Sequence, residues 1–401
     1  MVFDDIIIGS GLAALATALG LPKNRKVLVL AGTKLPNVSY YDVNSGVPCA
    51  NSGFGGLGAY WHGVIPTGHL QAFASLSDNT FTELFNTFYP KGGVENKLNS
   101  PWLFVPYQPV RPENWWPKLI LERSGNLQLI YQLADSIEII GDKKATVISS
   151  GQKFSAQRLW IACGALGTPK LLENSPMSKG VSRGSVSDHV ISYLGQINRE
   201  KHRHILQPIV ERNSSGVWMQ GTIDSDYKGL VTMKPARFGY RQLDYGIEQR
   251  SAFGLPVKSL MNKLYRAGSL GLIAESLFNK FGLFPNANIQ SIYAQIYVKD
   301  AYTINASDQK MMANISTIQN AILNYRELLN APEIEYSHKS DLFIKGIHLH
   351  NSLNNAKLID ININTTKSNV AIVDSSVIEN IGPEHHSFKV MTAAYTRAKN
   401  S

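Results

Sequence analysis

The sequence reads Ile6-Ile7-Ile8-Gly9-Ser10-Gly11-Leu12-Ala13-Ala14 near its start, and this stretch decides the fold. An apolar strand that runs into G-x-G-x-x-A and then into a Leu/Ala-rich helix is the dinucleotide fingerprint of a Rossmann βαβ unit. Gly9 permits the tight turn, Gly11 lets the backbone approach a pyrophosphate, and Ala14 lets the helix pack closely on the sheet. The N-terminus of that helix then presents unpaired N–H groups to the phosphates. We therefore expect an α/β nucleotide-binding domain.

The second strand of this unit is predicted at 26–30, which makes residues 5–30 one βαβ unit. In such units an acidic residue after the second strand binds the adenosine ribose. Here Ala31-Gly32-Thr33-Lys34 follows, and it contains no carboxylate. Either Thr33 or a backbone group takes that role, or the adenosine end is bound more weakly. A nicotinamide cofactor with a phosphate on its ribose would also explain the missing carboxylate, since Lys34 follows, but we consider this explanation weaker.

Several later runs have the period of strands or helices. We predict strands at 127–130, 136–140, 145–149, 158–163 and 370–373, and helices at 168–174, 311–329 and 388–398. The first βαβ unit lies at the start of the chain, whereas the last strand and helix lie near its end. This order predicts a chain that leaves the nucleotide domain, builds a second domain and returns.

Length and composition bound the class of protein. The 401 residues, 44% of them hydrophobic, predict a globular protein of two or three domains. The 39 basic and 30 acidic side chains give a net charge of +9. Such a charge fits an anionic partner, namely nucleic acid, an acidic membrane surface or an acidic substrate, but a diffuse surface surplus is the interpretation we favour. The dense basic cluster at 199–204 keeps the first interpretation open.

The two cysteines cannot form a disulfide framework. We expect no signal peptide, because the chain reaches its predicted first strand by about residue 4, and no apolar run approaches the roughly 18 residues of a membrane span. We therefore expect a cytoplasmic protein. The segment 260–284 is apolar but interrupted by lysine and arginine. It is interpreted as an amphipathic helix that covers the substrate site, with peripheral contact to a membrane as the alternative.

Four separated segments resemble a known family. They are the fingerprint, the glycine-rich run 53–63, the run IACGALGTPKLL at 161–172 followed by Asp188-His189, and a C-terminal block comprising 348–352, 373–378, His385-His386 and 390–394. In content and order they resemble the glucose–methanol–choline family of flavin oxidoreductases, and within it the pyranose-oxidase-like members. The run 161–172 is the most specific match, and the middle of the chain matches only loosely.

The resemblance implies a Rossmann-like FAD-binding domain of the p-hydroxybenzoate-hydroxylase-like type, discontinuous in sequence, with an inserted α+β substrate domain. The implied FAD-binding domain comprises 1–70, 126–195 and 345–401, and the substrate or cap domain comprises 71–125 and 196–344. FAD is expected to be noncovalent, because Tyr60 stands where covalently flavinylated relatives have histidine. The implied cofactor-binding residues are Gly9, Gly11, Ala14, Gly55, Gly56, Tyr60, Trp61, Ala162, Gly164, Asp374 and Ser375, and no metal is expected.

The C-terminal block is where the resemblance places the chemistry. In the family, a histidine from an H-x-x-G-T motif and a second histidine or asparagine roughly forty residues later deprotonate a substrate hydroxyl while hydride leaves its carbon. Imidazole suits this work because its pKa lies near neutral pH. His348 matches the first position and His385 the second. The motif is degraded here, and a small shift in alignment would substitute His350 or His386.

The resemblance therefore predicts an FAD-dependent enzyme that oxidises a hydroxyl group of a sugar or related alcohol. The positive charge fits an anionic or nucleotide-linked sugar, while the electron acceptor is not indicated. Three alternatives stay open: a flavin-dependent reductase of lipid or isoprenoid double bonds, a flavin-containing nucleic-acid-binding protein, and a noncatalytic flavin scaffold. The histidine pair disfavours the reductase, and only the cluster at 199–204 supports nucleic acid, which makes that partner the weaker expectation.

Overall fold

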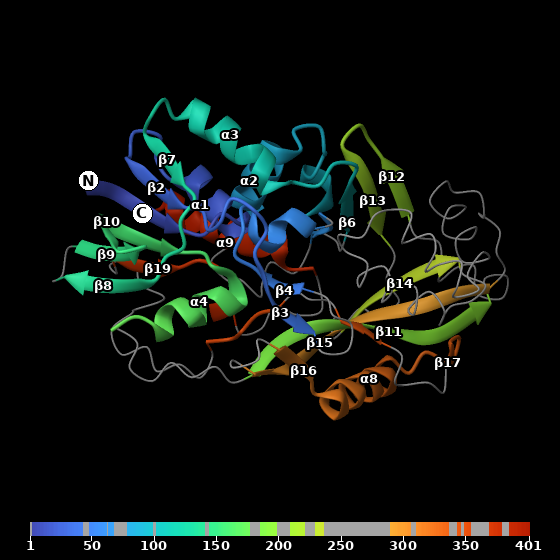
Figure 1. The fold of residues 1–401 in the computed structure, drawn as a ribbon. Helices are drawn as coiled ribbons and strands as arrows, with labels where there is room; N and C mark the ends of the chain where they lie inside the picture. The colour runs from blue at the N-terminus through green and yellow to red at the C-terminus, as the bar shows by residue number, and fades with distance from the viewer. Residues whose placement is uncertain are drawn as a thin grey trace, which may run out of the picture.

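The computed structural model describes residues 2–42, 48–61, 63–67, 78–98, 102–140, 144–176, 185–198, 209–220, 229–235, 289–305, 310–336, 343–345, 349–353, 369–378 and 385–401. These residues form three sheets with associated helices in a mixed α/β fold (Figure 1). Within them, no helix has the length and apolar character needed to cross a membrane. The basic cluster at 199–204 and the segment 260–284 lie outside the described residues.

The first sheet has a parallel core. Its neighbouring parallel strands are β7 (Leu127–Ile130), β2 (Val27–Leu30), β1 (Val2–Ile8), β10 (Gln152–Ile161) and β19 (Val370–Ile372). The amino-terminal half of β10 also pairs with antiparallel β9 (Lys144–Ser149), which pairs in turn with β8 (Ser136–Ile140). Strands from the start, middle and end of the chain therefore lie side by side, and the strands predicted at 127–130, 136–140, 145–149 and 370–373 are confirmed.

Helices cover both faces of this sheet. One face carries α1 (Leu12–Gly20), α2 (Asp78–Phe88), α3 (Pro112–Glu122) and α9 (Ser387–Lys399), and the other carries α4 (Gly164–Glu173). Strand β1 is apolar on both sides for this reason: Ile7 packs with the first group, whereas Ile6 and Ile8 pack on the face of α4. Helices α1 and α9 pack closely, since a Cβ on Gly20 would lie 2.5 Å from the Tyr395 carbonyl oxygen.

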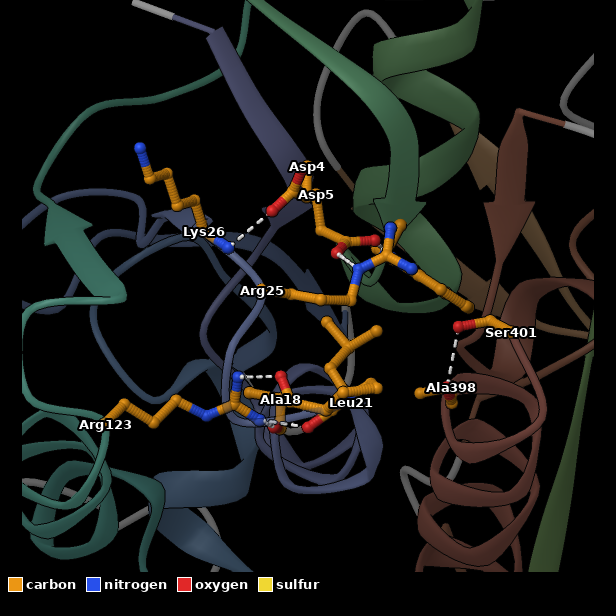
Figure 2. A network of polar contacts seen from close by, with 11 residues as sticks. Asp4, Asp5, Ala18, Leu21, Arg25, Lys26, Arg123, Ala398 and Ser401 are labelled. Atoms are coloured by element: carbon orange, nitrogen blue, oxygen red, sulfur yellow. Dashed lines mark hydrogen bonds and ion pairs between the residues drawn. The ribbon is translucent and has the colours of Figure 1, made fainter.

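Polar contacts fix the amino-terminal half of β1 (Figure 2). The buried carboxylate of Asp5 accepts a hydrogen bond from Arg25 Nε at 2.5 Å and one from Trp160 Nε1 at 2.8 Å. Burial nevertheless raises the pKa of Asp5, and the two donors only partly offset that effect. The guanidinium of Arg123 donates to carbonyl groups at the end of α1, which satisfies acceptors that a helix C-terminus leaves open.

The second sheet is built on two long antiparallel strands, β11 (Ser185–Asn198) and β15 (Ile289–Asn305). The strands that extend it are β14 (Gly229–Pro235), β16 (Lys310–Ala313), β17 (Glu335–Tyr336), β18 (Phe343–Lys345), β3 (Val38–Asp42) and β4 (Pro48–Asn51). Helix α8 (Ile315–Leu329) covers one face with its buried residues Ile318, Ile322 and Tyr325.

The start of α8 corrects the helix predicted at 311–329. Residues 310–313 instead form β16, whose backbone groups pair with β15. Asn314 is the N-cap residue between β16 and α8; its backbone N–H donates to the Ala301 carbonyl at 2.9 Å and its side-chain amide donates to the Asp300 carbonyl at 2.7 Å. The two apolar residues Met311 and Met312 are compatible with the start of a helix or with a strand, and the pairing of residues 310–313 with β15 favours the strand.

The third sheet is small and comprises β12 (Ile209–Arg212), β13 (Gly216–Gln220), β6 (Leu103–Pro106) and β5 (Ile65–Pro66). A short 3-10 helix, η3 (Glu95–Lys97), precedes β6. Phe104 and Trp218 from this sheet pack against Phe85 of α2, with ring centroids 5.0 and 5.7 Å from that ring. Their cluster is continuous with the core around α1 and α9. The domain boundaries given above stay predictions.

Candidate functional site

The fingerprint loop requires its first glycine. Gly9 has a φ of +114°, and a Cβ added to it would lie 2.3 Å from the carbonyl oxygen of Ala162. Its N–H donates to the Leu30 carbonyl at 2.9 Å, which ties the turn to the end of β2. Ala14, further along α1, is completely buried against the sheet. The loop therefore has the close backbone approach that the spacing of the motif predicts.

The N-terminus of α1 can bind an anion. Gly11 occupies the N-cap position without a capping side chain, and the first turn carries no acidic residue. The first N–H groups of a helix have no partner within the helix, and they carry its positive dipole end. A Cβ on Gly11 would meet nothing nearer than the Gly55 carbonyl oxygen at 3.7 Å. These features fit a dinucleotide pyrophosphate.

Ser10 connects this loop to two distant segments. Its hydroxyl donates to the Ala31 carbonyl at 2.8 Å, just beyond β2, and accepts from the Gly55 N–H at 3.0 Å. Its own carbonyl accepts from Trp116 Nε1 at 2.9 Å. One buried serine thus holds together the end of β2, the glycine-rich run and helix α3.

The glycine-rich run lies across the fingerprint. Gly56 begins a 3-10 helix, η1 (Gly56–Tyr60), and a Cβ on Gly56 would lie 3.5 Å from Gly11 Cα. Asn51 supports the run, since its amide nitrogen donates to the Gly56 carbonyl at 3.1 Å and its Oδ1 accepts from the Gly53 N–H at 2.9 Å. Trp61, which follows η1, is buried. The predicted residues Gly55 and Gly56 therefore do meet the fingerprint.

The carboxyl ends of β10 and β19 meet through Asp374. One carboxylate oxygen of Asp374 accepts from the Gly164 N–H at 2.9 Å and from the Thr168 hydroxyl at 2.5 Å. The other accepts from the N–H and hydroxyl of Ser376, at 2.9 and 2.6 Å, in the 3-10 helix η4 (Ser375–Val377). These bonds give Asp374 a structural role that its sequence pattern did not reveal. Its contact with a cofactor stays a prediction.

The segment 349–353 lies between this junction and the second sheet. His350 exchanges two backbone hydrogen bonds with Ser187 of β11, both at 3.1 Å. The next residue, Asn351, has a φ of +61° and donates its N–H to the Ser375 carbonyl at 3.0 Å. The Ser375 hydroxyl donates to the Leu349 carbonyl at 2.9 Å. The segment therefore anchors a histidine between the two sheets.

Three histidine rings meet at this place. His189 of β11, His350 and His386, which immediately precedes α9, are all buried. The ring centroid of His386 lies 5.1 Å from each of the other two, and those two lie 5.8 Å apart. We call these three side chains the histidine cluster. Among the described residues, no group of three or more histidine, cysteine or acidic side chains has the arrangement of a metal site.

Side chains of the second sheet surround the histidine cluster. The Gln295 amide nitrogen lies 3.3 Å from His189 Nδ1, within hydrogen-bonding distance. The Tyr297 ring, opposite His189 in the strand register, lies 5.5 Å from the His350 ring between centroids. Tyr302 donates its hydroxyl hydrogen to the buried carboxylate of Asp188 at 3.0 Å. The cluster is therefore set in a polar, hydrogen-bonded wall of β11 and β15.

The structure describes two of the three predicted catalytic histidines, His350 and His385. His350 belongs to the histidine cluster, while His348 lies outside the described residues. His385 is half-buried, and it is the adjacent His386 whose ring packs with the cluster. His189 was not among the predicted catalytic residues, although the Asp188-His189 pair had marked this strand. Strand pairing between distant segments, which no local pattern encodes, brings His189 to the site.

Comparison with known proteins identifies the fold. Pyridoxine 4-oxidase from Mesorbium loti aligns over 99% of this chain and 99% of its own, with a TM-score of 0.53 and 12% sequence identity. The fold is that of pyridoxine 4-oxidase. Because the alignment with pyridoxine 4-oxidase covers almost the whole chain, it includes the strands that carry the fingerprint and those that carry the histidine cluster. At this identity the likeness concerns the fold alone.

Two further solved structures are similar at 12% identity and a TM-score of 0.49. They are a formate oxidase variant from Aspergillus oryzae, matched over 99% of this chain and 97% of its own, and an FAD-dependent oxidoreductase from Chaetomium thermophilum, matched over 99% and 98%. No protein-family model matches the chain. No curated protein matches it significantly by sequence.

Proposed function

We propose that this protein is an FAD-dependent oxidoreductase that oxidises a hydroxyl group, with a histidine of the buried cluster as the base. The observation that carries the proposal is the mutual packing of three buried imidazoles at the junction of the two sheets. Imidazole is the side chain best suited to take a proton near neutral pH. The fold, shared with an oxidase, and the segments that resemble flavin oxidoreductases support the same function.

The residues of the fingerprint fit the dinucleotide part of FAD. The N-terminus of α1 would hold the pyrophosphate, with Gly9 and Gly11 allowing its close approach. Gly55 and Gly56 would lie beside it, since both contact the same loop. A bound flavin would supply the hydride acceptor for the carbon that bears the hydroxyl. We propose that FAD binds noncovalently, because Tyr60 stands where covalently flavinylated relatives have histidine.

Within the histidine cluster, His386 is the candidate base. It immediately precedes α9, and its buried ring packs against both other rings of the cluster. The ring of His350 lies beside it and can hold a substrate oxygen or share the proton. Loss of the hydroxyl proton to an imidazole, together with loss of hydride from the same carbon, leaves a carbonyl group. His350 would therefore orient the substrate hydroxyl, and His386 would accept its proton.

The substrate that we propose is a sugar or a related alcohol. This rests on the resemblance of the sequence to pyranose-oxidase-like enzymes, and the net charge of +9 favours an anionic or nucleotide-linked form. The tyrosine and glutamine side chains of β15 beside the cluster are suited to hydrogen-bonding a polyol.

An absorption spectrum and an anaerobic titration test the function. Purified protein supplied with FAD is expected to retain a flavin spectrum after gel filtration and to release the flavin into the supernatant on acid precipitation. Addition of an oxidisable sugar from a panel of free and nucleotide-linked sugars is expected to bleach the spectrum without oxygen. A chain that binds no FAD, or bound flavin that no alcohol reduces, would overturn the proposal.

A further inference from the structure

The end of β2 lacks the carboxylate that binds the adenosine ribose in dinucleotide folds. Thr33, the polar side chain nearest to that position in sequence, donates its hydroxyl hydrogen to the Leu35 carbonyl at 2.7 Å. Its one donor is thus used within the turn. If the proposed FAD site is correct, a carboxylate from elsewhere in the chain would restore the charged acceptor that the end of β2 lacks.

Glu113 brings a carboxylate to this edge from helix α3. A Cβ built on Gly55 would lie 2.9 Å from Glu113 Oε2, so the carboxylate lies directly against the Gly55 backbone. The Gly55 N–H is bonded to the Ser10 hydroxyl, which is bonded to the Ala31 carbonyl at the end of β2. Three consecutive contacts therefore link this carboxylate to the end of β2.

Helix α3 fixes the direction in which Glu113 points. Trp116 is one turn further along the same helix, is fully buried, and donates its Nε1–H to the Ser10 carbonyl at 2.9 Å. Side chains three residues apart share one face of a helix, so Glu113 faces the fingerprint loop as Trp116 does. Glu113 also lies in the first turn of α3, where the helix dipole favours a negative charge.

One oxygen of the Glu113 carboxylate is unpaired among the described residues. This oxygen, Oε2, is buried. A buried carboxylate oxygen without a donor is unfavourable, and such groups in folded proteins generally have a partner. An ionised phosphate has no donor for this oxygen and repels a carboxylate, whereas a sugar with two adjacent hydroxyl groups can donate to it.

We infer that Glu113 is a cofactor-binding residue that accepts hydrogen bonds from the adenosine ribose hydroxyls of FAD, in place of the missing carboxylate at the end of β2. This inference rests on the proposed function, and it assigns the adenosine end of the dinucleotide to the space between α3, Gly55 and the turn after β2. The ribose half of the site is then complete, with its acidic residue contributed by a helix instead of a strand.

The test compares ADP, 2′-deoxy-ADP and 3′-deoxy-ADP, which probe the ribose hydroxyls without any flavin chemistry. Calorimetric titration of the apoprotein is expected to show that removal of at least one hydroxyl weakens binding by about ten- to a hundred-fold, the range for a hydrogen bond to a charged group. In Glu113→Gln the three ligands are expected to bind with nearly equal affinity, and FAD is expected to bind more weakly. The control is Glu122→Gln, which removes an exposed carboxylate from the last turn of the same helix.

The outcomes separate this inference from the proposed function. If the wild-type protein binds FAD but Glu113→Gln keeps the same discrimination among the three ligands, Glu113 does not contact the ribose, and only the inference fails. Tighter binding of ADP by Glu113→Gln would place the carboxylate beside the phosphates and would overturn it as well. If the wild-type protein binds neither FAD nor ADP, both proposals fail. Thermal unfolding of each apoprotein shows whether the variants are folded.

Discussion

The imidazole rings of His350 and His386 lie 5.1 Å apart between centroids, in a buried contact between a segment bonded to the second sheet and a helix packed on the first. Each ring is held by its own part of the fold. Their separation therefore depends on how the two sheets are joined. This matters for a proton acceptor, which must lie within hydrogen-bonding reach of the proton that it takes.

The histidine cluster gives a prediction that distinguishes two neighbouring residues. His386→Ala is expected to slow anaerobic reduction of bound flavin by about 10²- to 10⁴-fold, the usual contribution of a general base. His385→Ala is the control, because its half-buried side chain precedes the buried ring in sequence. Stopped-flow absorbance measures both rates, and flavin content shows that the site is intact. A large loss in the His385 variant with normal rates in the His386 variant would contradict the assignment.

Gly9 gives a prediction about the fingerprint turn. Gly9→Ala is expected to lower the free energy of unfolding by about 3 kcal/mol or more, because backbone strain and overlap with the Ala162 carbonyl oxygen add together. Gly125→Ala is the matched control, since Gly125 has a φ of +87° but open space around its Cβ position. It should lose only the roughly 1–2 kcal/mol of a left-handed backbone. Urea unfolding measures both, and equal losses would show that the close approach to Ala162 is not a constraint.

Ser10 gives a prediction about the connection between distant loops. Ser10→Ala removes the hydrogen bonds to the Ala31 carbonyl and from the Gly55 N–H, so we expect a loss of about 1–3 kcal/mol in stability and weaker FAD binding. Thr17→Ala removes a buried hydroxyl of α1, the helix that follows the loop of Ser10; this hydroxyl donates to the Ala13 carbonyl within the helix. It should reduce stability without changing FAD affinity. FAD titration by fluorescence quenching measures the difference, and parallel losses in both variants would contradict it.

The sequence predicted the parts of the fold that depend on neighbouring residues. The fingerprint could be found because the strand, the turn and the helix each have a local signature, and Gly9 occupies a position where a side chain would meet Ala162. The later strands at 127–130 and 370–373 were also found from short apolar runs. Their positions in the sheet, beside β2 and β10, follow from pairing that no run of residues encodes.

The candidate site shows the limit of such prediction. His189 reaches the cluster through the register of β11, and Glu113 reaches the fingerprint through the packing of α3, so neither role could be found from spacing. The degraded motif around His350 left the register of the catalytic histidines open, and only the buried ring packing favours His386 over its neighbour. Asp374 was found in its segment, but the donors that engage it come from α4 and η4.

The buried carboxylate of Asp5 gives a prediction for the pH dependence of stability. Burial raises its pKa in the folded state, so the folded protein binds this proton more tightly than the unfolded chain does. The stability that the group contributes is therefore complete below the ordinary aspartate pKa, and it is lost as the pH rises through the folded-state pKa. Asp5→Asn abolishes this titration and keeps an oxygen for Trp160 Nε1, while the partly exposed Arg25 can turn to water.

The stability difference between the two proteins consequently changes with pH. Relative to Asp5→Asn, the wild-type protein is expected to become less stable as the pH is raised from about 4 towards neutrality, with a slope of at most about 1.4 kcal/mol per pH unit for one proton. Urea unfolding of both proteins at a series of pH values measures that slope. A constant difference, or a wild-type protein that gains stability over the variant on raising the pH, would mean that Arg25 and Trp160 outweigh burial at Asp5.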